Sequence, residues 1–175
     1  MYSRVLVPID GSPIASRALD EALTLAHDVG ARIQALYVID APPVSARASP
    51  YCYQDFHDAY AREGRAACDE AAIRMQKTDF RSSTRVVEVN LADEDLAQRI
   101  ATSAREFGAD LIVMGTHGRH GWRRIVLGSV AERLVRLVSC PVLFVPARAR
   151  ERIYSERRRV QDDERYRKVL KETAS

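Results

Sequence analysis

The sequence predicts an α/β protein whose core is an open, twisted, five-stranded parallel sheet with helices on both faces. Short apolar runs alternate with amphipathic stretches along the chain, which is the pattern of consecutive β-α-β units. Two of the runs, 5–9 and 111–114, are apolar throughout, as expected for strands that are covered on both faces. Together these observations predict strands that pair in parallel between two layers of helices.

The first strand, turn and helix can be assigned residue by residue. Pro8 has no N–H for a sheet ladder, so we expect it at the end of the strand 5–9, next to a turn. Ser12 is placed to cap the following helix, and Pro13 suits the first position of that helix. Gly30 is expected to end it.

The remaining strands and helices are expected to alternate in the same way. Strands are predicted at 33–39, 85–89, 111–114 and 142–145, and helices at about 55–77, 93–107 and 129–138. If the first three strands wind one way and the last two the other, right-handed crossovers give the order 3-2-1-4-5 of a Rossmann-like sheet. The winding direction then reverses between strands one and four, where the loops diverge and leave a crevice. The loops after Ile9 and Met114 would meet there, so we expect the ligand site at that crevice.

The loop after the fourth strand has the residues of a phosphate site. Ser129 and Glu132 have the spacing of a capping box, which predicts Ser129 as the N-cap of the next helix, with neighbouring amides turned outward. Such a helix N-terminus binds anions through its free N–H groups and its dipole. Arg119, Arg123 and Arg124 add charges that can approach phosphates. The loop also contains glycines that let a ligand approach the backbone: Gly115, Gly118, Gly121 and Gly128. We therefore expect a phosphate-bearing ligand.

Two common nucleotide-binding signatures do not occur in the sequence. No G-x-x-x-x-G-K-[ST] pattern is found, which excludes a Walker P-loop. The first turn has no G-x-G-x-x-G, which disfavours a dinucleotide site of the NAD type. The phosphate site must therefore be of another kind.

Length and composition limit the remaining possibilities. A chain of 175 residues with 46% hydrophobic and 29% charged residues fits a soluble globular domain, with at most one appendage. No window approaches the roughly 20 apolar residues of a membrane-spanning helix, and the N-terminus has no signal-peptide core. Cys52, Cys68 and Cys140 are widely spaced and odd in number, as expected for reduced thiols. We expect a cytoplasmic protein with no membrane partner.

The net charge of +3 is unevenly distributed along the chain. Residues 148–175 contain ten Lys/Arg and six Asp/Glu, a net +4, whereas residues 1–147 carry a net −1. This division predicts a near-neutral domain over 1–147 and a charged, helical C-terminal extension over 148–175. The overall charge is too small to indicate a nucleic-acid partner. For the extension, a solvated helix and a docking element for a sister subunit or another protein are the alternatives.

The spacing Gly115-x2-Gly118-x9-Gly128-Ser129 resembles the ATP-binding motif G-x2-G-x9-G-[ST] of the universal stress protein family. Further similarity occurs in the same order and on the same predicted elements, in the blocks VLVPIDGS at 5–12, ADLIVMG at 109–115, LGSVAERL at 127–134 and CPVLFVP at 140–146. The resemblance covers about residues 1–147. The chain departs from the family at Asn90–Asp93, where many members have a Gly-x-Pro turn.

The resemblance implies a site for ATP, or for ADP or AMP. Asp10 would contact the ribose hydroxyls or a Mg²⁺ ion that enters with the nucleotide, although Asp10 could instead only stabilise its turn. Val38 would offer backbone groups to the adenine edge, with Pro8 and Met114 as apolar walls.

The same resemblance assigns the rest of the ligand to the glycine loop. Gly115 and Gly118 would surround the ribose and the phosphates. The phosphates themselves would be held by Gly128, Ser129 and Val130.

Three functions are compatible with these residues. The leading hypothesis is an adenine-nucleotide-binding stress-response sensor or signalling module that forms a homodimer through strand five, a sheet edge with an apolar sequence. A second hypothesis is slow ATP hydrolysis, with Mg²⁺ near Asp10 and with His117 or His120 positioning water, although solvated loop histidines are the simpler interpretation. The third is a nucleotide-independent adaptor that binds another protein through the dimer and the extension.

Overall fold

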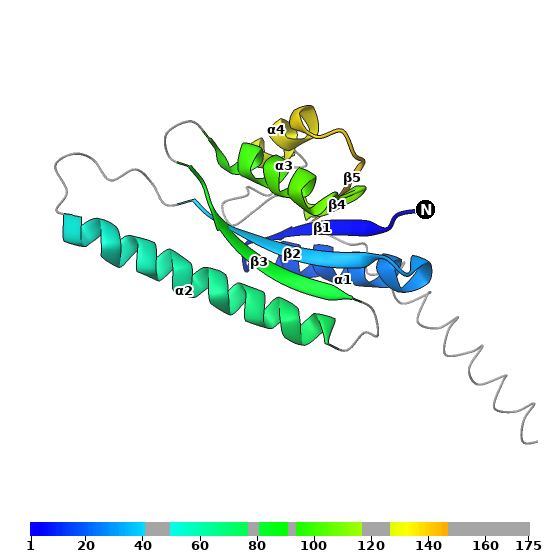
Figure 1. Cartoon of the computed structure of the whole chain (residues 1–175), viewed down its shortest axis with the longest axis horizontal. Helices are drawn as coiled ribbons and strands as arrows, with labels where there is room; N and C mark the ends of the chain where they lie inside the picture. The colour runs from blue at the N-terminus through cyan, green and yellow to red at the C-terminus, as the bar shows by residue number, and fades with distance from the viewer. Residues whose placement is uncertain (41–49, 77–80, 91–93, 117–126, 147–175) are drawn as a thin grey trace, which may run out of the picture.

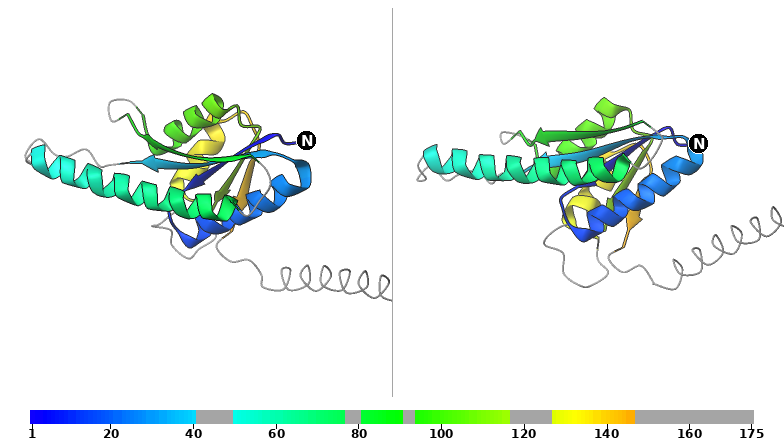
Figure 2. Two further views of the ribbon diagram at one scale, coloured as in Figure 1. Left: turned by 60° about the horizontal axis from the view of Figure 1, so that its bottom comes forward. Right: turned by 90° about the horizontal axis from the view of Figure 1, so that it is seen from below.

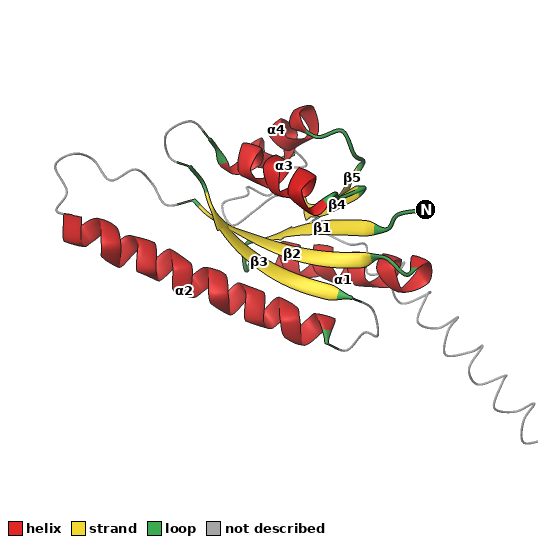
Figure 3. Cartoon of the chain, in the orientation of Figure 1, coloured by secondary structure: helices red, strands yellow, loops and turns green. Residues whose placement is uncertain are grey.

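A computed structural model of the chain describes residues 1–40, 50–76, 81–90, 94–116 and 127–146. Helices and strands alternate along these residues (Figures 1 and 3). The elements, in chain order, are β1 (Arg4–Ile9), α1 (Pro13–Val29), β2 (Arg32–Ile39), α2 (Pro50–Met75), β3 (Ser82–Glu88), α3 (Leu96–Phe107), β4 (Leu111–Gly115), α4 (Ser129–Leu137) and β5 (Val142–Val145). The predicted extension 148–175 lies outside the described residues.

The five strands form one parallel sheet in the order β3-β2-β1-β4-β5, which confirms the predicted fold. β1 is the central strand, and β3 and β5 are the two edges. All β-strand C-terminal ends therefore lie along one side of the sheet, and the winding reverses between β1 and β4. A ligand site at a sheet of this kind is expected where those two strands end.

Helices cover both faces of the sheet (Figure 2). On one face, α1 and α2 pack on the sheet through a core that includes Leu19, Ala71 and Ile33. On the other face, α3 and α4 pack through a second core that includes Ile100 and Leu134. The two cores together remove the apolar side chains of β1 and β4 from water on both faces, which explains why these strands have continuous apolar sequences.

The predicted ends of α1 are confirmed. Ser12 is the N-cap and its side-chain oxygen accepts a hydrogen bond from the Ala15 N–H at 3.3 Å. Pro13 occupies the first helical position, and Gly30 ends the helix in a left-handed conformation with φ of 69°.

Other element boundaries differ from the predictions. α2 begins at Pro50 rather than near residue 55, since a proline is tolerated in the first turn of a helix, where its missing N–H is not needed. β3 begins at Ser82 rather than Arg85, because the polar residues Ser82–Thr84 pair with β2 at an exposed sheet edge, where no apolar pattern is required. α3 begins at Leu96 rather than near residue 93 because Asp95 caps it.

Among the described helices, none is long and apolar enough to cross a membrane.

Candidate functional site

The strands β1 and β4 pair over only a short distance. Their register pairs Val5 with Leu111 and Leu6 with Ile112, whereas β1 continues to pair with β2 as far as Ile9. The C-terminal ends of β1 and β4 therefore separate. This separation lies at the reversal of winding, where the sequence predicted a crevice.

Pro8 gives a physical reason for the short ladder. The Ser3 carbonyl accepts from β2 through the Arg32 N–H, and the next carbonyl, that of Arg4, accepts from the Asp110 N–H on the β4 side. Because backbone groups in a central parallel strand turn to alternate neighbours, Pro8 faces β4. A proline has no N–H to donate, so the ladder between β1 and β4 cannot continue through this residue. The residue thus lies one position before the strand end, close to the place predicted from the sequence.

A tight turn connects β1 to α1 at the crevice. Gly11 has a φ of 76°, in the left-handed region that favours glycine. The Asp10 carboxylate accepts a hydrogen bond from the Ser12 N–H at 2.9 Å, which is the turn-stabilising role that the sequence left open. The predicted contact of Asp10 with a ribose or a Mg²⁺ ion stays a prediction. In the part of the chain that the structure describes, no group of three or more His, Cys, Asp or Glu residues is arranged to hold a metal ion.

The three predicted apolar wall residues lie on one face of the sheet. Met114 belongs to the core beneath α3 and α4, and Val38 packs against that core. Pro8 is on the same face, because side chains alternate along a strand and Leu6 belongs to this core. The structure therefore brings Pro8, Val38 and Met114 together on the α3–α4 side of neighbouring strands.

The glycine loop starts and ends at one point. Gly115 is buried at the end of β4, and the Thr116 carbonyl that follows accepts a hydrogen bond from the Gly128 N–H at 2.8 Å. This bond closes the loop 117–126, which lies outside the described residues together with the predicted ligands Gly118 and Arg119. The first residues of α4 are therefore held directly beside the end of β4.

The start of α4 corrects the predicted cap. The Gly128 carbonyl accepts from the Glu132 N–H at 2.9 Å, so Gly128 is the N-cap, and it provides no side-chain hydrogen bond. Ser129 is the first residue inside the helix, where its side chain cannot take the N-cap position. The predicted capping box also fails because Glu132 accepts from Arg136 at 2.7 Å within α4 instead of reaching back.

The start of α4 can therefore bind an anion. The N–H groups of Ser129 and Val130, in the first turn, have no intrahelical partner and no side-chain cap, whereas the N–H of the N-cap Gly128 already donates to Thr116. The helix dipole adds a partial positive charge at this end. Cys140 lies past the other end of α4, and burial raises the pKa of its thiol, so cysteine chemistry is not part of this site.

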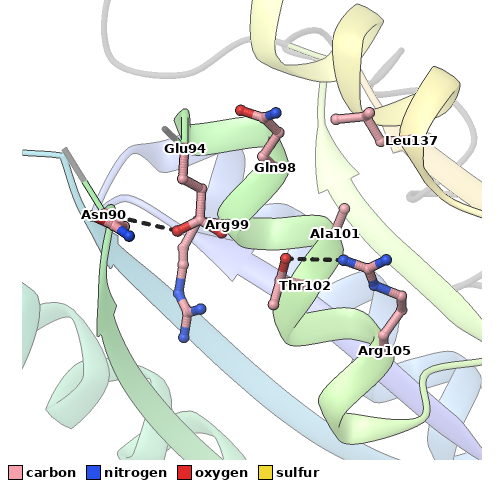
Figure 4. Close-up of a pocket in the computed structure, with 8 residues that line it drawn as sticks. All are labelled: Asn90, Glu94, Gln98, Arg99, Ala101, Thr102, Arg105 and Leu137. Atoms are coloured by element: carbon pink, nitrogen blue, oxygen red, sulfur yellow. Dashed lines mark hydrogen bonds between the residues drawn. The ribbon is translucent and has the colours of Figure 1, made fainter. Parts of the chain in front are cut away.

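A separate shallow hollow of about 480 Å³ lies on the outer side of α3 (Figure 4). It is lined by Asn90, Glu94, Gln98, Arg99, Ala101, Thr102, Arg105 and Leu137. None of these is a predicted ligand residue, and the lining includes charges of both signs. This hollow is distinct from the separation of β1 and β4.

Sequence reasoning missed Asp95, which precedes α3. Its carboxylate accepts from the Gln98 N–H at 2.8 Å, and the Gln98 side chain accepts from the Asp95 N–H at 2.8 Å. The other carboxylate oxygen pairs with Arg133 of α4. The spacing Asp95-x-x-Gln98 is a capping box and could have been found in the sequence.

Comparisons with known proteins agree with this architecture. The sequence model of the universal stress protein family matches residues 1–146. A universal stress protein of Methanocaldococcus jannaschii is 32% identical over 145 residues, which are 83% of this chain and 82% of that protein. The crystal structure of a protein of the same family from Burkholderia pseudomallei is 44% identical with a TM-score of 0.67, and the match covers 83% of this chain and 97% of that one.

A second similar structure contains a ligand. It is the crystal structure of a universal stress protein in complex with cAMP, which is 26% identical with a TM-score of 0.59 and matches over 82% of this chain and 97% of that one. The family match over most of the chain and the relative above 30% identity lead to one conclusion. The chain belongs to the universal stress protein family.

Proposed function

We propose that this protein binds adenine nucleotides, with ATP, ADP or AMP as the ligand, where β1 and β4 separate. The observation that carries the proposal is the uncapped N-terminus of α4, which the Thr116–Gly128 hydrogen bond holds at the end of β4. Its first-turn amides would hold the phosphates. The cAMP complex of a relative supports an adenine nucleotide as the ligand class.

The other residues that the sequence predicts at the site would contact the nucleoside and complete the phosphate end. Pro8, Val38 and Met114 would provide the apolar walls of an adenine site, and the strand end at Val38 would offer backbone groups to the base edge. Asp10 would reach the ribose or a Mg²⁺ ion that accompanies the phosphates. Gly115, Gly118 and Arg119 would complete the phosphate end of the site. The unit that binds is taken to be residues 1–147.

A thermal-shift screen of the full chain with ATP, ADP, AMP and adenosine, each with and without Mg²⁺, tests the proposal. A ligand at about 100 times its Kd stabilises the folded state by about 2.7 kcal/mol, which raises the Tm of a chain of this size by about 5–10 °C. We expect that shift for the phosphorylated ligands and a smaller one for adenosine. Unchanged melting with every nucleotide would contradict the proposal and favour the nucleotide-independent adaptor.

We infer that the protein is a stress-response sensor or signalling module whose output depends on whether a nucleotide is bound. Nucleotide can change the population of a signalling state only by the difference between its affinities for two states. The sequence identifies no general base, and His117 and His120 lie outside the described residues, so binding rather than turnover is the function proposed. Phosphate release measured on the same samples separates the two, because a binder leaves ATP intact over the time of the screen.

We also propose that the signalling state is a homodimer formed through β5. The β5 edge carries Leu143, which is 41% exposed, and α4 in the adjacent helix layer exposes Val135 at 46%. The opposite edge, β3, begins with the polar residues Ser82 and Ser83. An apolar edge strand is a surface that a second copy can cover by pairing with it.

Replacing Leu143 with Glu tests this edge. We expect Leu143→Glu to shift the chain from dimer to monomer in sedimentation velocity, because the substitution places a charge in the apolar contact. Ile73→Glu is the matched control, since Ile73 is a 60% exposed apolar residue on α2, away from β5. A dimer that survives Leu143→Glu, or one lost equally in Ile73→Glu, would exclude β5 as the interface.

A further inference from the structure

One carboxylate joins the two helices of the α3–α4 layer. One oxygen of Asp95 accepts from the Gln98 N–H and caps α3, and the other lies 2.5 Å from the Arg133 Nε of α4. The carboxylate thus connects the first turn of α3 to the second turn of α4. A shift of α4 along or away from α3 would break this connection.

Within the described part of the chain, few polar contacts tie α4 to its neighbours, and its other attachments are apolar, with Val130 and Val138 packed against the core beneath it. It is a helix of nine residues, and its fully packed side chains are Ala131 and Leu134. At its start, Gly128 donates to Thr116. Arg136 pairs with Glu132 inside the same helix, so this pair does not tie α4 to a neighbour. The ion pair of Arg133 with Asp95 does, and it lies one turn from the N-terminal amides.

We propose that Asp95 and Arg133 are positioning residues that aim the N-terminus of α4 at the nucleotide phosphates. This inference rests on the proposed function and extends it to two residues that do not themselves touch the ligand. Arg133 and Asp95 are 57% and 40% exposed, so their pairing adds little to overall stability. Its effect is on where the phosphate donors point, and a small displacement of such donors lowers affinity.

Asp95→Asn and Arg133→Gln remove the ion pair without removing the cap of α3. Asparagine is as good an N-cap as aspartate, but its amide nitrogen cannot accept a hydrogen bond from Arg133. By calorimetry on the full chain, we expect each variant to bind ATP about two- to fivefold more weakly, the range for an exposed pair. Adenosine affinity should not change. The double variant should bind ATP no more weakly than either single variant, because the two residues act as one unit.

The sign of the Asp95→Asn effect separates positioning from a direct effect of charge. If the two side chains acted on the phosphates only through their charges, Arg133→Gln would weaken ATP binding and Asp95→Asn would strengthen it. Positioning predicts that both weaken it. Stronger or unchanged ATP binding in Asp95→Asn would overturn the inference.

Arg136→Gln is the matched control. It removes the same charge from the same helix and breaks the pair with Glu132, which stays within α4. We expect its ATP affinity to stay within about twofold of the wild type, with a melting temperature similar to that of Arg133→Gln. An equal loss of affinity in Arg136→Gln would overturn the inference by showing a general effect of charge. A wild-type chain that binds no nucleotide would instead remove the proposed function on which the inference rests.

Discussion

Two helices begin beside the separation of β1 and β4, and their N-termini are built differently. At α1, the Ser12 side chain accepts from Ala15 N–H, and Asp10 accepts from Ser12 N–H. At α4, the N-cap is Gly128, which has no side chain to accept a hydrogen bond. α1 therefore has donors at its start that are satisfied by its own chain, whereas the start of α4 has no such side-chain acceptor.

This difference indicates which helix is available to a ligand. A capped N-terminus is stabilised locally and gains less from an anion, whereas an uncapped one leaves donors that an anion can satisfy. α3 follows α1 in this respect, since Asp95 and Gln98 form a complete capping box. Among the N-termini of α1, α3 and α4, that of α4 is the one without a side-chain cap.

Giving α4 the cap that it lacks should have the largest effect. In Gly128→Asp, a carboxylate would take the N-cap position and compete with phosphate for the same amides. We expect at least a tenfold loss of ATP affinity by calorimetry, on the order of 1.4 kcal/mol or more. Stability should stay the same or rise by a few tenths of a kcal/mol, because aspartate is a better N-cap than glycine.

Gly128→Ala is the control for this change. Gly128 has a φ of −61°, a conformation open to any residue, so alanine adds a methyl group without backbone strain or charge. It should lower ATP affinity less than aspartate does. Wild-type affinity in Gly128→Asp would show that the start of α4 does not hold the phosphates.

Removing the cap of α1 should lower stability and leave ATP affinity nearly unchanged, which is the opposite of the result expected for Gly128→Asp. Ser12→Ala takes away the hydrogen bond to Ala15 N–H and should destabilise the protein by about 1 kcal/mol in urea unfolding. ATP affinity should stay within about twofold of the wild type, because this N-terminus has a structural role. A large loss of affinity at unchanged stability would identify α1 as the ligand helix and reverse the comparison.

The smallest effect on stability is expected at the β3 edge of the sheet, away from β1 and β4. His57 of α2 lies 3.2 Å from Glu88 at the end of β3, and the hydrogen bond and attraction to Glu88 raise the pKa of His57 above 6.5. A raised folded-state pKa adds stability that is complete below 6.5 and is lost as the pH rises through the raised value.

His57→Gln tests this pH dependence. The Tm difference between wild type and variant should be largest near about pH 5.5 and shrink towards about pH 8. The effect should be small, because both side chains are partly exposed. ATP affinity should show no matching dependence on this substitution, since neither helix at the separation is involved. A Tm difference that grows with pH would contradict the assigned partner of His57.

The sequence was most informative where local chemistry leaves one choice. Ser12, Pro13 and Gly30 fix both ends of α1, and the apolar run at 111–114 marks a strand that is buried on both faces. The order of the sheet follows from the alternation of elements and from the handedness of crossovers. That order alone puts the turn at Asp10 and the start of α4 at the same reversal of winding.

The sequence was least informative where two patterns compete. Ser129 and Glu132 have capping-box spacing, yet the Gly128 carbonyl accepts the first helical hydrogen bond, and Glu132 pairs with Arg136. Ser82–Thr84 have no apolar signal because an edge strand needs none. The link between Asp95 and Arg133 depends on how α3 packs beside α4, a contact between distant residues that spacing alone does not give. The proposed contacts of Gly118 and Arg119 with the nucleotide stay predictions, because both residues lie outside the described part of the chain.

The most direct test compares the two N-termini in one experiment. Amide chemical shifts of the full chain, recorded by NMR during titration with ATP and with adenosine, report on each backbone N–H separately. We expect ATP to shift the amides of Gly128, Ser129 and Val130 strongly, and those of Ile14 and Ala15 little, while adenosine leaves the α4 amides nearly unchanged. ATP-induced shifts centred on Ile14 and Ala15, with the start of α4 unaffected, would contradict the account.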